Sequence, residues 1–158
     1  MKTIKQERGQ SLVELAISLL VLLYLLSGAV EFGLAFFQFV QLRDAAQEGA
    51  LFGSMGPDAT TIETRARGAS SSPIDLAQNN PLLPRYVGVT ITAKDKDTNL
   101  PIPVAGACEG DALIVEVSFD HQVFMPFMSQ IIGATVPLNA TVTDTVLSPI
   151  QTSVSCAP

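Results

Sequence analysis

A short charged segment opens the chain, and a long apolar run follows it. The run 12–30 contains one carboxylate, Glu14, and no other charge. At 1.5 Å per residue it spans about 28 Å as a helix, close to the roughly 30 Å hydrocarbon core of a bilayer. Because no proline precedes Pro57, the pattern predicts one helix from about Ser11 to about Phe52. Its first half would lie in lipid and its second half outside.

The helix is expected to leave the membrane near Glu31. Polar side chains then become frequent, and they predict emergence into water at Gln38, Gln41, Arg43 and Asp44. About 110 residues remain beyond the helix, which is enough for one modest hydrophobic core and too few for two.

A second, shorter helix is predicted at 59–69. Asp58 or Thr60 would cap its N-terminus, since both side chains can accept from a free backbone N–H. Glu63 and Arg67 stand four residues apart and would pair on its surface. A second short helical turn is expected at 74–78.

Three segments alternate apolar and polar residues with the period of half-buried strands, namely 86–92, 112–119 and 138–146. Joined by loops, they fit an antiparallel meander with one polar face. The fold class expected is therefore α+β: a long N-terminal transmembrane helix, then a small domain. That domain would have one or two short helices and a three- to four-stranded antiparallel sheet.

A further apolar cluster covers 123–128 together with Ile131 and Ile132. It is too short and too interrupted to span a membrane. Two interpretations stay open: a crossover that plugs the core between strands, or an interfacial or subunit-contact patch near the membrane.

The charge pattern indicates both topology and class. A net charge of −6 argues against nucleic acid as a partner, because phosphate binding needs clustered Lys and Arg. Lys2, Lys5 and Arg8 precede the apolar run, which favours a cytoplasmic N-terminus and an extracytoplasmic outer domain. On that side oxidation is permitted, so Cys108 and Cys156 are expected to form a disulfide that ties down the C-terminal tail. Two unpaired thiols are the alternative.

Little in the sequence indicates catalysis. His121 is the single histidine and is expected at the surface or in a loop. The segment 95–99 is similar to the start of a calcium-binding loop, but Leu100 and Gly106 stand where that loop needs Gly and Glu. A charged hairpin turn is the preferred interpretation. No enzyme, cofactor or metal is expected.

The N-terminal segment admits two ordinary interpretations. One is a cleaved signal peptide, with the small-x-small sequence 27–29 as its cleavage site; the other is a plain single-pass anchor. Glu14 would interrupt the apolar region of a signal peptide, and the run is longer than the usual 7–15 residues.

A third interpretation comes from a resemblance. Gly9-Gln10-Ser11-Leu12-Val13-Glu14-Leu15-Ala16 resembles the opening of TadE-like pseudopilins, which typically reads G-Q-A/S-x-V-E-F-A. Glu31-Phe32-Gly33 is similar to the E-F-G that closes their membrane segment, and 43–50 is similar to their N-x-A-A-R-E-G-A turn. Leu15 and Gln47 depart from the family pattern, and the common Pro is missing. Three matches in the right order over residues 8–52 make this the favoured interpretation.

The resemblance implies a minor pilin-like subunit of a tight-adherence (Flp) pilus or a related secretion machine. Its implied partners are the membrane, a prepilin peptidase, other pilin-like subunits and the pilus assembly platform. It would sit in the bacterial cytoplasmic membrane as a single-pass protein. Residues 1–9 would be a prepilin-type leader, 10–52 the N-terminal helix, and 53–158 the extracytoplasmic α+β domain.

Cleavage is expected between Gly9 and Gln10, which creates an α-amino group four residues before Glu14. In an assembly the Glu14 carboxylate of one subunit would meet the amine of its neighbour. Either charge alone would be costly in a place of low dielectric. A membrane-anchored extracytoplasmic binding module without a pilus role is the alternative, and it would keep residues 1–9.

Overall fold

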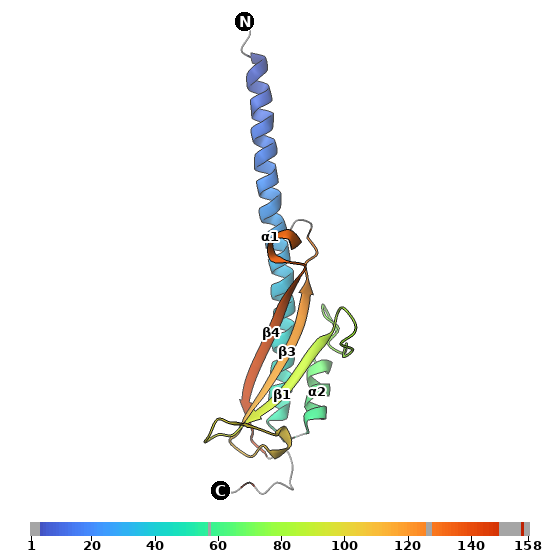
Figure 1. Cartoon of the computed structure of the whole chain (residues 1–158), viewed down its shortest axis with the longest axis vertical. Helices are drawn as coiled ribbons and strands as arrows, with labels where there is room; N and C mark the ends of the chain where they lie inside the picture. Colours follow the sequence, from blue (N-terminus) through green and yellow to red (C-terminus); the bar gives the residue numbers. More distant parts are fainter. Residues whose placement is uncertain (1–3, 57, 126–127, 149–155, 157–158) are drawn as a thin grey trace.

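The computed structural model describes residues 4–56, 58–125, 128–148 and 156, with side chains from Gly9 on. One long helix, α1 (Ile4–Gly53), projects from a small domain that packs against its second half (Figure 1). The architecture confirms the predicted α+β class. The other elements are α2 (Ala59–Gly68), β1 (Val87–Lys94), β2 (Pro101–Ile102), a 3-10 turn (Val104–Gly106), β3 (Ala112–Gln122), α3 (Ser129–Ile132) and β4 (Thr135–Thr145).

Helix α1 runs without interruption for 50 residues. It begins at Ile4 rather than near Ser11, and so includes part of the expected leader. Every residue from 9 to 26 is exposed, although the run is mostly apolar. Within the described part of the chain, α1 is the one helix long and apolar enough to cross a membrane.

The sheet has four antiparallel strands in the order β2-β1-β3-β4. Its three long strands are the predicted ones, and β2 is a two-residue edge that carries no sequence signal. Strand β4 starts at Thr135, before the predicted start at 138, and includes Pro137. An edge strand tolerates proline because one row of its N–H groups has no ladder partner.

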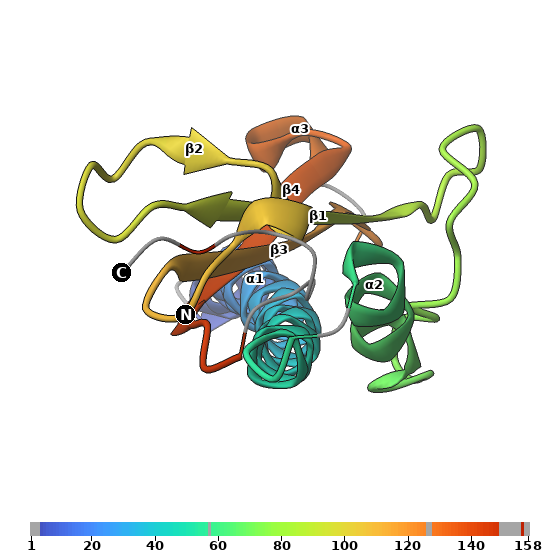
Figure 2. The same ribbon diagram turned by 90° about the horizontal axis from the view of Figure 1, so that it is seen from below.

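Helix α1 lies across one face of the sheet, and α2 lies beside it (Figure 2). The alternation of β3 turns every second residue toward the helices. The buried apolar core of this layer comprises Leu42, Ala45, Ala46 and Ala50 of α1, Ile62 and Ala66 of α2, and Leu113, Val115, Val117 and Phe119 of β3.

Two glycines of α1 allow this close packing. A Cβ on Gly49 would lie 3.0 Å from Ala66 Cβ and 3.3 Å from Val115 Cγ1. A Cβ on Gly53, one turn further on, would overlap the side chain of Leu113. Because the two glycines share one helix face, α2 and β3 can both approach the backbone of α1.

Helix α2 is capped by Asp58, one of the two predicted caps. The Asp58 carboxylate accepts hydrogen bonds from the hydroxyl of Thr61 at 2.7 Å and from its backbone N–H at 3.0 Å. These bonds hold the pKa of Asp58 below its usual range. The predicted pair is present, with Arg67 Nε 2.8 Å from Glu63 Oε1. Arg67 also donates to the Val87 carbonyl at 3.0 Å, which ties α2 to β1.

The segment after β1 is a hairpin turn, as predicted. The Asp95 carboxylate accepts from the backbone N–H of Thr98 at 2.7 Å and of Asp97 at 3.1 Å. Asn99 takes the left-handed conformation at φ 56° that closes the turn toward β2.

The expectation that Gln38 and Gln41 emerge into water is wrong. Both are buried, at 7% and 6% exposure, because the outer domain packs against this stretch of α1. The Gln41 amide pairs with the backbone of Ile74, donating to its carbonyl at 2.7 Å and accepting from its N–H at 2.8 Å. Arg43 and Asp44 are exposed as expected.

Candidate functional site

The residues of the expected processing and assembly segment lie on the bare part of α1. Gln10 and Glu14 stand four residues apart on one face, and both are exposed. Within the described residues, Glu14 has no ion-pair partner. A Cβ on Gly9 would meet nothing within 4 Å. The packing of the fold therefore requires neither the glycine nor the carboxylate.

The basic residues of the expected leader fall outside this description. Lys2 lies outside the described residues, and so do the side chains of Lys5 and Arg8. The backbone around the expected cleavage site is helical on both sides, because α1 begins at Ile4.

A buried polar cluster joins α1 to the sheet where the helix is expected to leave the membrane. Its members are Glu31 and Gln38 of α1 and His121 of β3, exposed by 3%, 7% and 1%. His121 Nε2 lies 2.7 Å from Glu31 Oε1, and His121 Nδ1 lies 2.6 Å from Gln38 Oε1. Each ring nitrogen thus has one oxygen atom within hydrogen-bond distance, and which nitrogen donates depends on the tautomer. We call this cluster the exit junction.

Glu31 also binds the chain that follows β3. Its Oε1 accepts from the Phe124 backbone N–H at 3.1 Å, and its Oε2 accepts from that of Met125 at 2.9 Å. One carboxylate therefore holds a histidine and two backbone donors, which compensates for its burial. The exit junction fixes the near end of the sheet to α1 over the two turns between Glu31 and Gln38.

Sequence periodicity explains how these residues meet. Glu31 and Gln38 are seven residues apart, two turns of helix, and continue toward Leu42 along the seam that faces the sheet. On β3 the inward positions include Phe119 and then His121. The polar residues at the end of the buried face of α1 therefore meet His121, the polar residue at the end of the inward face of β3.

The expectation that His121 is a surface or loop residue is wrong. The strand was predicted to end at 119, but β3 continues to Gln122 and keeps its alternation. That alternation places His121 on the inner face, where it is 1% exposed. The signal that could have located it is the two-residue period, extended by one more step past Phe119.

At the opposite end of the domain, Cys108 and Cys156 are joined in a disulfide, with their Cα atoms 5.7 Å apart. The chain just after β4 is held by a backbone bond, since the Leu147 N–H donates to the Ser54 carbonyl at 2.8 Å. Residues 149–155, which belong to the expected tail, lie outside the described residues.

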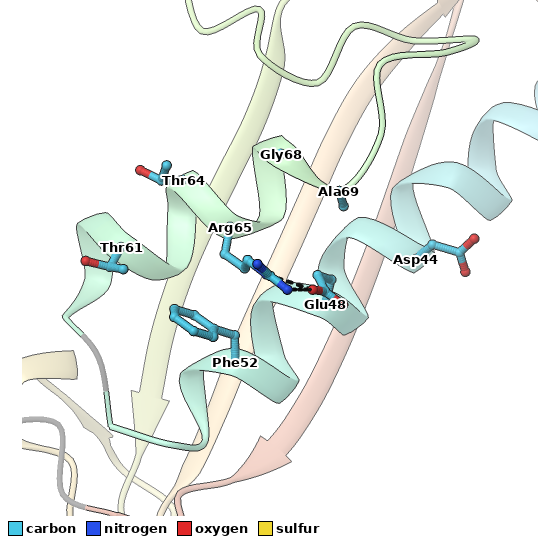
Figure 3. Close-up of a pocket in the computed structure, with 8 residues that line it drawn as sticks. All are labelled: Asp44, Glu48, Phe52, Thr61, Thr64, Arg65, Gly68 and Ala69. Carbon is cyan, nitrogen blue, oxygen red and sulfur yellow. Dashed lines mark hydrogen bonds and ion pairs between the residues drawn. The ribbon is translucent and has the colours of Figure 1, made fainter.

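A surface groove of about 690 Å³ follows the seam between α1 and α2 (Figure 3). Arg65 of α2 crosses it to Glu48 of α1, with Nη2 2.6 Å from Oε1, and its guanidinium lies 5.5 Å from the Phe52 ring centroid. Asp44 lies at one end and is exposed. An exposed ion pair of this kind contributes less than about 1 kcal/mol, so we assign the groove a packing role.

The structure does not bring the predicted site residues together. Glu14 lies in the first quarter of α1, whereas the disulfide joins Cys108, just before β3, to Cys156. Among the described residues, no group of three or more His, Cys, Asp or Glu gathers that could hold a metal. The arrangement offers an exposed apolar rod with one carboxylate, fixed rigidly to a small folded domain.

Comparison with known proteins gives a match for most of α1. Residues 9–51 match the family model of TadE-like proteins. The resemblance predicted from the sequence is thereby confirmed, and the TadE-like segment contains both Glu14 and Glu31. It ends within α1, so α2 and the sheet lie beyond it. No curated protein and no solved structure matches the chain.

Proposed function

We propose that this protein is a minor pilin-like subunit, a pseudopilin, of a tight-adherence (Flp) pilus or a related secretion machine. The observation that carries the proposal is the placement of Gly9, Gln10 and Glu14 within the TadE-like segment. All three lie on an exposed apolar helix and make no contact that the fold needs. Residues that the fold does not need are available for processing and assembly.

A prepilin peptidase would cleave between Gly9 and Gln10 and remove residues 1–9. Because α1 is helical through this point, the backbone has to unwind locally to enter a protease. Glycine is, after proline, the residue that weakens a helix most, by about 1 kcal/mol relative to alanine. Gly9 thus combines an accessible backbone with a low cost of unwinding.

Cleavage gives Gln10 a new α-amino group beside the membrane. A carboxylate in the span costs about 2.5–3.5 kcal/mol on insertion scales. Pairing Glu14 with the amine of a neighbouring subunit would compensate both charges where water is scarce. The pair would also set the axial register between neighbouring helices, because each subunit supplies one donor and one acceptor.

The role proposed is structural rather than enzymatic. The anchor lies in the bacterial cytoplasmic membrane, crosses it once through about 12–30, and places residues 53–158 on the extracytoplasmic side. The partners are the peptidase, other pilin-like subunits and the assembly platform. The exit junction and the α1–α2 packing support this role, because force on the rod would reach the domain without a flexible linker.

Replacing Gly9 by valine should block processing while leaving the fold unchanged. A side chain at position 9 has open space around it, so any effect arises from recognition by the peptidase. Pulse-labelling in cells that express a prepilin peptidase should show the short mature form for the wild-type chain and only the full-length form for Gly9→Val.

Gly33→Val is the matched control, since a Cβ on Gly33 in the same helix also meets nothing within 4 Å. It should be processed at the wild-type rate. Processing of Gly9→Val at that same rate would contradict cleavage after Gly9 and favour the membrane-anchored binding module.

Thiol labelling tests the topology together with the disulfide. We expect Cys108 and Cys156 to resist a maleimide in intact, unreduced cells, because they are bridged. After treatment with a reductant, a membrane-impermeant maleimide added from the extracytoplasmic side should label both. Labelling without reduction would reject the bridge in the cell, and labelling from the cytoplasmic side alone would reject the proposed orientation.

A further inference from the structure

The described residues between β3 and β4, 123–125 and 128–134, form a mostly apolar segment whose outer side the fold leaves uncovered. We call it the β3–β4 connection. It contains no Asp, Glu, Lys or Arg. Its large side chains point outward: Phe124 is 61% exposed, Ile131 68% and Ile132 45%. The interpretation of this cluster as a plug of the core is therefore wrong for these three residues, while Pro126 and Phe127 lie outside the described residues.

The connection lies against the last turns of the expected membrane span. Met125 and the span residues Leu20, Leu23, Tyr24, Leu26, Ser27 and Val30 line one apolar cavity of about 350 Å³. Met128 Cε approaches the Cβ position of Gly28 to 3.7 Å. In Figure 1 the coloured turn of α3, which belongs to the connection, lies at the end of the domain that faces the N-terminal half of α1.

Several of its backbone N–H groups have acceptors inside the protein. Glu31 accepts from the N–H groups of Phe124 and Met125. The N–H of Val123 donates to the Ala134 carbonyl at 3.0 Å, and that of Ile132 donates to the Met128 carbonyl at 3.0 Å. Backbone that enters an apolar medium must be satisfied in this way, because water is not available there.

We propose that the β3–β4 connection inserts into the outer leaflet of the same bilayer that α1 crosses. The occupant of this surface is lipid, because the surface is continuous with the exposed apolar span and carries no charge that would select a protein partner. Ser27 lies four residues before Glu31, so contact at its level places the connection about 6 Å inside the end of the span. That depth is within the roughly 5–10 Å reached by interfacial apolar segments.

The consequence is a second attachment of the domain to the membrane. A single helix leaves a domain free to rotate about the helix axis, whereas a helix with an adjacent inserted loop fixes one face toward the bilayer. The exit junction holds the two attachments together through Glu31. The proposal rests on the membrane anchor alone and is independent of a pilus role.

The absence of tryptophan from the sequence gives a direct test. Phe124→Trp and Ile131→Trp each introduce one reporter at an exposed position of the connection. The full chain would be reconstituted at low protein-to-lipid ratio in phosphatidylethanolamine–phosphatidylglycerol vesicles. Emission should be blue-shifted, and lipids brominated near the headgroup end of the acyl chain should quench it several-fold more than lipids brominated near the methyl end.

Two further variants calibrate the result. Val21→Trp, in the exposed span, should be quenched by the deeply brominated lipids, which verifies that the anchor is inserted. Leu100→Trp, equally exposed at 62% on the β1–β2 hairpin, should be unquenched and emit as in water. If Val21→Trp is quenched but both reporters in the connection emit as in water, the proposal is overturned. Blue-shifted reporters that brominated lipid fails to quench would overturn it as well, because protein would then cover the surface.

Discussion

Replacing Glu31 by alanine is expected to destabilise the outer domain by about 3 kcal/mol or more. Each buried donor that is left without its acceptor costs about 1–3 kcal/mol. Here the loss leaves His121 without its carboxylate and removes the acceptor of two backbone N–H groups. Total stabilities are commonly about 5–15 kcal/mol, so the change is a large fraction of the whole.

The measurement is thermal unfolding of the purified chain in detergent, followed through the sheet rather than through α1. A loss of this size lowers the midpoint by more than about 10 °C in a domain of roughly 100 residues. Glu48→Ala is the matched control, since Glu48 is a carboxylate of the same helix in an exposed ion pair and should shift the midpoint little. Equal midpoints for the two variants would contradict a stabilising role of the exit junction.

A double-mutant cycle would show how much of the lost stability comes from the contact between Glu31 and His121. His121→Ala should also destabilise the domain, and the double variant should lose clearly less than the two single losses added together, because the partners share one interaction. Strict additivity would show that Glu31 acts through the backbone of Phe124 and Met125 rather than through the histidine.

Replacing Glu14 by alanine should have the opposite profile, abolishing assembly while leaving the fold intact. The side chain is exposed and has no ion-pair partner within the described residues, so the unfolding midpoint should stay at the wild-type value. Insertion should be slightly favoured, because a costly group leaves the apolar run. Co-purification of other pilin-like subunits should fall to background.

Ser18→Ala is the control for that experiment, because Ser18 lies one turn further along the same exposed face of α1. It should retain the wild-type amount of partner subunits. Wild-type recovery of those subunits with Glu14→Ala would count against the proposed pairing of amine and carboxylate.

Local patterns predicted the elements of this fold well. The apolar run and the lack of an early proline gave α1, whose end at Gly53 lies one residue beyond the prediction. Two-residue alternation located the three long strands, and Asp58 was one of two predicted caps. These features depend on neighbours within a few residues, which is the range that periodicity and capping report.

The exit junction could not be found in the same way. Glu31 and His121 are 90 residues apart in the chain, and each alone has an ordinary interpretation, as an interfacial carboxylate and a surface histidine. Gln38, taken alone as a polar residue beyond the apolar run, was likewise expected in water. Only the packing of α1 across the sheet turns three scattered polar residues into one buried cluster. Gly53 was missed similarly, because its role depends on the side chain of Leu113 on a distant strand.

Pilin-like processing of this chain is the central requirement of the proposed function. The intact mass of the protein purified from the membrane of cells with a prepilin peptidase decides it. We predict a chain that begins at Gln10, with residues 1–9 absent and the Cys108–Cys156 bridge present. A chain that retains residues 1–9, or one that begins near Val30, would contradict the proposed function.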